Sequence, residues 1–147
     1  MLKKAAFRKI ELSNLIQADI DEHWKDIKTG LYSIKQESNE PETFKDYYDA
    51  CKKGLAILWV DKEVKEKKAF LITKVLKRHY TSEKYLLLWV AWYSEANGAY
   101  RAQGDLEVIA KMFNCKSIEF WTSRSEIMNY GKTHGYNSIT YKCVKEI

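Results

Sequence analysis

The spacing of apolar residues predicts a helix in the first third of the chain. Phe7 to Leu12 is expected to form a short strand, and Ser13 is a good N-cap for a helix that follows it. Gly30 weakens this helix near its end. We expect Trp24 in the core, where Trp24→Ala would cost about 3 to 5 kcal/mol if the ring is fully buried. The apolar positions of the helix share one face: Leu15, Ile16, Ile20, Trp24, Ile27 and Leu31.

A second helix is predicted after the polar loop Gln36 to Glu40. Pro41 suits the first turn of a helix, and Gly54 stands where a glycine commonly ends one. Between them, four residues share a face: Phe44, Tyr47, Tyr48 and Cys51.

From Leu55 onward the apolar pattern changes to that of strands. LAILWV and AFLITKVL are rich in apolar and β-branched residues, and the charged turn Asp61 to Lys68 separates them, which predicts a β-hairpin. A second turn, His79 to Lys84, leads into YLLLWVAWY. Because a nearly unbroken apolar run is typical of a strand covered on both faces, Tyr85 to Tyr93 is expected to be the central strand.

The last third of the chain predicts alternating helices and strands. After the turn-rich SEANGAY comes a helix with one apolar side, and then the strand SIEFWT. A short helix, a turn at Gly135 and the strand ITYKCV complete the chain. The apolar residues of the two helices are Leu106, Ile109, Ala110 and Phe113 in the first, and Ile127, Met128 and Tyr130 in the second.

The resulting order βααβββαβαβ predicts an α/β (α+β) fold, a mixed sheet of about six strands flanked by helices. A helical crossover between two strands favours parallel neighbours. Ser117 to Thr122 should therefore pair in parallel with Tyr85 to Tyr93, with the helix of Leu106 to Phe113 crossing between them.

Length and composition predict one globular domain spanning residues 1–147. The chain is 46% hydrophobic, 31% charged and 14% aromatic, which is typical of a soluble globular protein and not of a disordered one. No apolar run approaches the roughly 20 residues that cross a bilayer, and the N-terminus lacks a secretory signal. We therefore expect a cytoplasmic protein with no membrane partner.

Charge and cysteine content restrict the candidate chemistry. The net charge of +5 is compatible with nucleic acid, an acidic protein or CoA phosphates as a partner. The densest basic stretch, Lys62 to Arg78, also contains Glu63 and Glu66, which favours a solvated hairpin over a nucleic-acid surface. The cysteines are three in number and widely spaced, so they predict reduced thiols and no metal site: Cys51, Cys115 and Cys143.

The order of elements resembles that of the GNAT (N-acetyltransferase) superfamily over nearly the whole chain. Two segments carry the resemblance: YLLLWVAWY with the following helix that ends AKMFNCKSIEF, and IMNYGKTHGY with the strand after it. The resemblance implies an acetyl-CoA-dependent transferase that acts on an amine or protein acceptor. Acetyl-CoA would lie where the fourth and fifth strands splay apart. The backbone of Trp89 to Trp92 would pair with its pantetheine, which implicates Val90, Ala91 and Trp92.

The resemblance also implies a pyrophosphate loop of the pattern Q/R-x-x-G-x-G/A, in which backbone N–H groups at a helix N-terminus hold anionic oxygens. The pattern falls on Ser94 to Ala99, where Ser94 replaces the usual Gln or Arg and Glu95 adds a negative charge. An ordinary strand-to-helix loop is the alternative. The implied cofactor-binding residues of this segment are Asn97, Gly98, Ala99, Tyr100 and Arg101.

The family's usual general acid, the tyrosine of F-Y-x-x-x-G-F, has no counterpart. With Gly135 and Tyr136 aligned to the end of the pattern, Gly131 takes the tyrosine position and Tyr130 lies one residue earlier. Cys115 is expected to be a core thiol. The catalytic residues stay unassigned. The remaining acidic and imidazole groups, of which the histidines are favoured as surface or packing residues, are Glu95, Glu119, His23, His79 and His134.

Two functional hypotheses follow. In the first, the chain is an acyl-CoA-dependent N-acyltransferase that acts mainly by holding the amine near the thioester. In the second, it is a catalytically inactive GNAT-like protein that binds a viral or host protein or a nucleic acid. The tryptophan-rich early helices and altered signatures resemble bacteriophage-encoded proteins, which would place the protein in the host cytoplasm or the virion.

Overall fold

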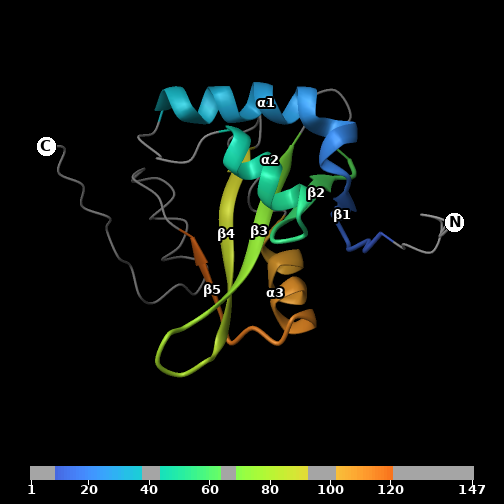
Figure 1. Ribbon diagram of the computed structural model, residues 1–147. Coiled ribbons are helices and arrows are strands. Elements are labelled where there is room, and N and C mark those ends of the chain that lie inside the picture. The colour runs from blue at the N-terminus through green and yellow to red at the C-terminus, as the bar shows by residue number, and fades with distance from the viewer. Residues whose placement is uncertain (1–8, 38–43, 64–68, 93–101, 121–147) are drawn as a thin grey trace, which may run out of the picture.

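A five-stranded mixed sheet forms the centre of the computed structural model, which describes residues 9–37, 44–63, 69–92 and 102–120. The strands lie in the order β1-β2-β3-β4-β5, as Figure 1 shows. The first four pair antiparallel, and β4 and β5 pair in parallel. Their bounds are β1 (Leu15–Ala18), β2 (Ile57–Asp61), β3 (Phe70–Lys77), β4 (Lys84–Trp92) and β5 (Ser117–Phe120).

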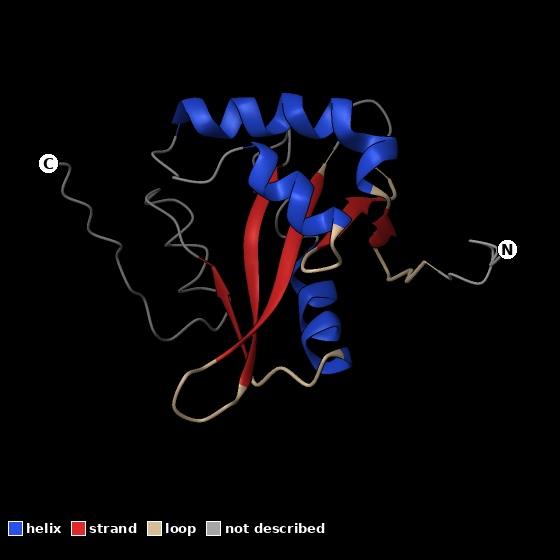
Figure 2. Ribbon diagram, viewed as in Figure 1, coloured by secondary structure: helices blue, strands red, loops and turns tan. Residues whose placement is uncertain are grey.

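Helices cover both faces of the sheet (Figure 2). Helices α1 (Ile20–Glu37) and α2 (Phe44–Lys52) pack on one face, where Ile27, Leu31 and Tyr47 join a buried cluster with Leu58 and Ile72 of the sheet. Helix α3 (Gln103–Met112) packs on the other face, where its apolar side meets strand residues in a second cluster. That second cluster contains Leu15, Trp59, Leu71, Leu86, Leu106, Ile109 and Ala110.

The fold class and the order of elements through β5 agree with the sequence prediction. Both hairpins form, and β5 is the parallel neighbour of β4 across α3. The strand predicted to be central, β4, is an interior strand between β3 and β5, whereas β3 is the middle strand of the described sheet. The predicted helix at Ile127 to Tyr130 and the strand ITYKCV lie outside the described residues.

The predicted start of the chain is wrong in its boundaries. Strand β1 begins at Leu15, inside the predicted helix, and α1 begins only at Ile20. Leu15 is fully buried against α3, and its segment forms a strand of the sheet where the apolar spacing predicts a helix. Asp19 provides the cap, because its Oδ1 accepts a hydrogen bond of 2.8 Å from the backbone N–H of Asp21. The described part of the predicted first strand contributes a single bridge, between Glu11 and Ile16.

Trp24 lies at the edge of the core and not inside it. Its side chain is partly buried, and its ring centroid is 5.0 Å from that of Tyr48 on α2. Ile20, Ile27 and Leu31 occupy the buried positions of α1 as predicted. Since part of the ring stays in water, Trp24→Ala will cost less than the range for a fully buried tryptophan.

Two helices end in the same hydrogen-bonded motif. At the end of α2, the N–H of Gly54 donates to the carbonyl of Cys51 (3.3 Å) and the N–H of Leu55 to that of Ala50 (2.9 Å). At the end of α3, Asn114 and Cys115 repeat this pattern with Lys111 and Ala110. Gly54 and Asn114 have φ values of 75° and 57°, as a Schellman motif requires.

Gly54→Ala should lower the free energy of unfolding by about 1 kcal/mol, because a left-handed backbone is strained in any residue with a Cβ. Gly104→Ala is the matched control, since neither glycine has an atom within 4 Å of an added Cβ and only Gly54 has a positive φ. Gly104 lies in α3, where alanine should be neutral or stabilising. Equal unfolding midpoints for the two variants in urea would contradict this account.

Candidate functional site

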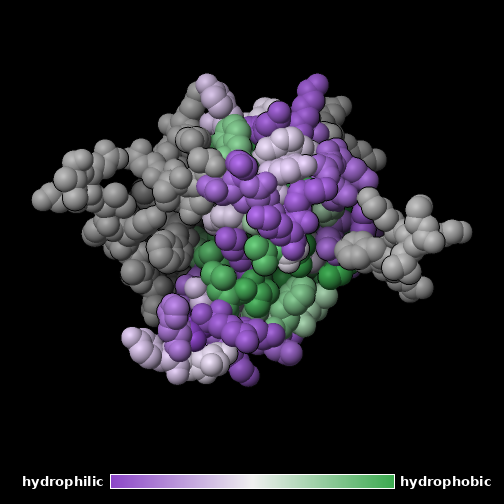
Figure 3. All heavy atoms as spheres, viewed as in Figure 1, coloured by the Kyte–Doolittle hydropathy of each residue, from purple (hydrophilic) through white to green (hydrophobic). Residues whose placement is uncertain are grey.

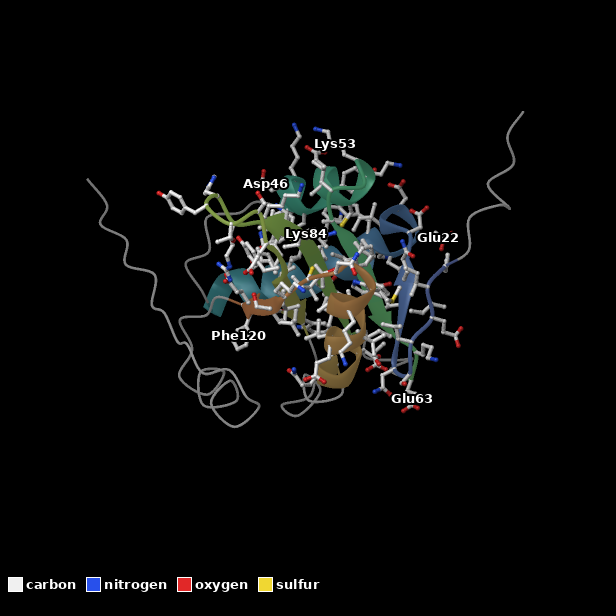
Figure 4. The ribbon with its side chains drawn as sticks, turned by 90° about the horizontal axis from the view of Figure 1, so that it is seen from below. Glu22, Asp46, Lys53, Glu63, Lys84 and Phe120 are labelled. Atoms are coloured by element: carbon white, nitrogen blue, oxygen red, sulfur yellow. The ribbon has the colours of Figure 1, made fainter. Side chains whose placement is uncertain are left out.

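The described pairing of β4 with β5 covers only the first part of β4. Its described register runs from Tyr85 opposite Ser117 to Leu88 opposite Phe120. Strand β4 continues to Trp92, still paired with β3 on its other side. Phe120, where the described part of β5 ends, is labelled in Figure 4. Among the described residues, one backbone edge of the segment from Trp89 to Trp92 therefore has no strand beside it.

A bulge interrupts β4 just after its last described pair with β5. Ile72 of β3 lies opposite Val90 while the next residue, Thr73, lies opposite Leu88, so Trp89 is the extra residue. Leu88 packs toward α3, whereas Trp89 and its neighbour Val90 both pack toward α1 and α2. A bulge of this kind shifts the alternation of a strand and re-aims its side chains.

The structure describes three of the eight predicted cofactor-binding residues. Val90, Ala91 and Trp92 occupy the β4 segment beyond the last pair with β5. Val90 and Trp92 pack toward α1 and α2, and Ala91 packs toward α3, so their backbone edge and not their side chains faces the β5 side of β4. The other five lie outside the described residues: Asn97, Gly98, Ala99, Tyr100 and Arg101.

Helix α3 begins immediately after that undescribed segment. Its N-cap, Ala102, is buried and provides no side-chain hydrogen bond to the first turn. Asp105, in the first turn, is 3% exposed, and its Oδ2 accepts hydrogen bonds from the backbone N–H groups of Asn14 (2.8 Å) and Leu15 (2.9 Å). This carboxylate joins α3 to the start of β1.

Aromatic rings and a cation gather around Trp89 on the α1/α2 side of the sheet. The Trp89 ring lies 4.5 Å from the ring of Tyr47, and the Lys74 ammonium lies 3.5 Å from its centroid. Burial raises the pKa of the nearby Cys51 thiol to about 11, although Lys74 opposes the shift. Cys51 is half-buried and, with this raised pKa, is a protonated thiol at neutral pH.

Glu119, one of the predicted candidate bases, is held by Arg78. The guanidinium of Arg78 donates to Glu119 Oε1 and to Ser117 Oγ, the latter at 3.3 Å, and it lies 4.6 Å from the ring of Tyr85. The hydrogen bond from Arg78 to Glu119 raises the pKa of Arg78. Glu119 immediately precedes Phe120, so this ion pair lies next to the last described pair of β4 and β5.

The other predicted candidates are dispersed. His23 is half-buried on α1, and His79 is exposed in the turn after β3. Cys115 is half-buried, and burial raises the pKa of its thiol. Within the described ranges, no group of three His, Cys, Asp or Glu side chains is arranged to hold a metal ion. The candidates outside the described residues are Glu95, Tyr130, Gly131 and His134.

The sequence prediction did not single out Lys74, which the structure places against the Trp89 ring. The sequence favours a solvated hairpin for the densest basic stretch, Lys62 to Arg78, yet Lys74 of β3 and Arg78, the residue after β3, both lie beside aromatic rings. Their spacing of four residues, which places two side chains on the same side of a strand, was the available signal.

Figure 3 shows hydrophilic residues over α1 and α2 and on the β3–β4 hairpin, with a hydrophobic area between them.

No helix among the described residues has the length and apolar character that a membrane span requires. Neither protein-family models nor curated protein sequences match the chain.

Solved acetyltransferase structures share this architecture at low sequence identity. A putative acetyl transferase from Pyrococcus furiosus has a TM-score of 0.65 at 12% identity over 90% of this chain and 99% of that one. A predicted acetyltransferase from Clostridium acetobutylicum, solved with acetyl-CoA, has a TM-score of 0.64 at 15% identity over 90% and 95%. An aminoglycoside N-acetyltransferase solved with CoA has a TM-score of 0.65 at 7% identity over 91% and 98%. The sheet order, the parallel β4–β5 pair and these likenesses together show that the chain has the GNAT acetyltransferase fold.

Proposed function

We propose that this protein is an acetyl-CoA-dependent N-acetyltransferase. The observation that carries the proposal is the β4 edge from Trp89 to Trp92, which continues past the last described β5 partner. Backbone N–H and C=O groups on such an edge need partners, and the amides of a pantetheine chain can supply them. The solved relatives that contain acetyl-CoA or CoA support this ligand class.

The reaction would depend mainly on positioning. Acetyl-CoA supplies a thioester; the acceptor nitrogen forms a bond to the acetyl carbon, the carbon–sulfur bond breaks, and the proton lost by the amine is matched by the one the CoA sulfur gains. The protein would align the pantetheine of the cofactor along Trp89 to Trp92 and hold the amine beside it. Such alignment contributes on the order of 7 kcal/mol or more in well-oriented systems.

Acetyl-CoA titrated into the purified protein should give saturable heat in calorimetry. Arg101→Ala should weaken the binding by roughly 1.5 to 3 kcal/mol, the range for hydrogen bonds to charged groups, because we expect its guanidinium to contact a phosphate. Lys53→Ala removes an exposed cation at the end of α2 and is the control for nonspecific attraction. Absence of any heat with millimolar acetyl-CoA would refute the proposed function.

An inactive binding module is the second candidate, and one observation favours it. From Tyr85 to Trp92, strand β4 carries neither a carboxylate nor an imidazole, so the strand itself offers no base to the proposed site. In this case the fold would be retained for a protein or nucleic-acid partner. Binding of acetyl-CoA without acetyl transfer to any amine would support it. The viral origin stays a hypothesis from the sequence.

A further inference from the structure

The strand register lines up a cation, a leucine and a carboxylate across the sheet. Lys74 of β3 lies opposite Leu87 of β4, and Leu87 lies opposite Glu119 of β5. Two neighbouring-strand spacings separate the outer Cα atoms by about 10 Å. The row lies one position before the pair Leu88–Phe120, after which β4 continues alone among the described residues.

All three side chains belong to the α1/α2 side of the sheet. Leu86 and Leu88 pack toward α3, so Leu87, which lies between them, points to the opposite face. Lys74 lies over Trp89, which packs on that same side. Glu119 follows Ile118, a residue of the α3 side, and therefore alternates with it.

Each charged group keeps capacity for a ligand. Lys74 is half-buried, and within the described part of the chain its ammonium interacts with the Trp89 ring and with no carboxylate. Glu119 accepts from Arg78 through Oε1, which leaves Oε2 without a hydrogen-bond partner among the described residues. A half-buried ammonium gains most from an anion, and a free carboxylate oxygen gains most from a charged donor.

We propose that this row binds the acceptor, and that the acceptor is a primary amine which also carries an anionic group. The ammonium meets Glu119, the carboxylate or phosphate of the same molecule meets Lys74, and Leu87 forms the floor between them. The statement that this ligand is the acceptor rests on the proposed function. The chemistry of the ligand rests on the strand register alone. A ligand that carries only positive charges would be repelled by Lys74.

The test uses small ligands without any cofactor. ω-Amino carboxylates of increasing chain length, diamines of the same lengths and simple carboxylates are each titrated into the protein and followed by NMR. The amino carboxylates should bind roughly tenfold or more tightly than either of the other series, because only they satisfy both charges. An optimum at one chain length would report the spacing between the two sites.

Charge variants identify the residues. Lys74→Met should remove the preference for amino carboxylates over diamines, Lys74→Glu should reverse it in favour of diamines, and Lys74→Arg should keep the wild-type preference. Lys77→Met is the matched control on the same strand, because its side chain is exposed and alternates to the other face. An unfolding midpoint equal to that of the wild type shows that a variant has folded. If Lys74→Met does not fold, the comparison of Lys74→Arg with the wild type tests the proposal instead.

The outcomes separate the two proposals. Wild-type protein that binds diamines as tightly as amino carboxylates, or a preference that survives Lys74→Met, overturns the inference whatever acetyl-CoA does. Zwitterion binding in a protein that does not bind acetyl-CoA overturns the acceptor role and the proposed function while the site itself stands. Acetyl transfer to an amino carboxylate, reduced in Lys74→Met and intact in Lys77→Met, supports both.

Discussion

Asp105→Ala should lower the free energy of unfolding by about 3 kcal/mol or more. The Asp105 carboxylate is buried and accepts the backbone N–H groups of Asn14 and Leu15. Removing it leaves two donors without partners, one of them on a fully buried residue, and each orphaned donor costs roughly 1 to 3 kcal/mol. The carboxylate also lies in the first turn of α3, where negative charge stabilises a helix. Urea denaturation followed by circular dichroism measures the change.

Two comparisons test whether the hydrogen bonds carry this effect. Asp105→Asn keeps an acceptor oxygen of the same reach, so it should lose clearly less stability than Asp105→Ala. Glu107→Ala removes an exposed carboxylate from the same helix and should change the free energy of unfolding by less than about 0.5 kcal/mol. If Asp105→Ala and Glu107→Ala unfold at the same urea concentration, the link between α3 and β1 contributes nothing.

Gly30→Val should destabilise the protein by about 3 kcal/mol, although glycine in a helix interior is ordinarily worth replacing. A Cβ on Gly30 would lie 2.6 Å from Cε1 of Phe70 and 3.0 Å from Cδ2 of Trp92. Helix α1 approaches the ends of β3 and β4 this closely only because position 30 has no side chain. The sequence suggested that Gly30 weakens the helix near its end, yet α1 continues to Glu37.

A neighbouring substitution and a compensating one make the prediction specific. Thr29→Val introduces the same side chain one position earlier, on the exposed side of α1, and should be nearly neutral. Gly30→Ala combined with Phe70→Leu should cost less than the two single changes together, because the smaller side chain makes room for the new methyl group. Additive losses would show that the close contact is not the cause.

The sequence predicted the sheet better than the chain's beginning. The hairpins and the α3 crossover were predictable because apolar periodicity and turn residues agree there. Leu15 and Ile16 fit a helical stripe as well as a strand, and only pairing with β2 decides between them. Burial against α3, which depends on residues about ninety positions away, could not be foreseen from local spacing.

The placement of Val90 to Trp92 in β4 was predictable from the sequence, and the local geometry around them was not. The order of elements predicted that this run is a strand and that β5 is its parallel neighbour across α3. The bulge at Trp89 has no signature in a run of apolar residues, since both faces of β4 are covered. Lys74 and Glu119 are 45 residues apart in the sequence, and only the registers of two strand pairs place them in one row.

The bulge at Trp89 also reverses which positions of β4, odd or even, face each side of the sheet, and this matters for any redesign of the strand. Before the bulge, the even-numbered Leu86 and Leu88 face α3; beyond it, the odd-numbered Ala91 does. A new functional group meant for the α1/α2 side must therefore be placed at an odd-numbered position before the bulge or at an even-numbered position after it. A designer who counts straight through Trp89 would bury the group under α3 instead.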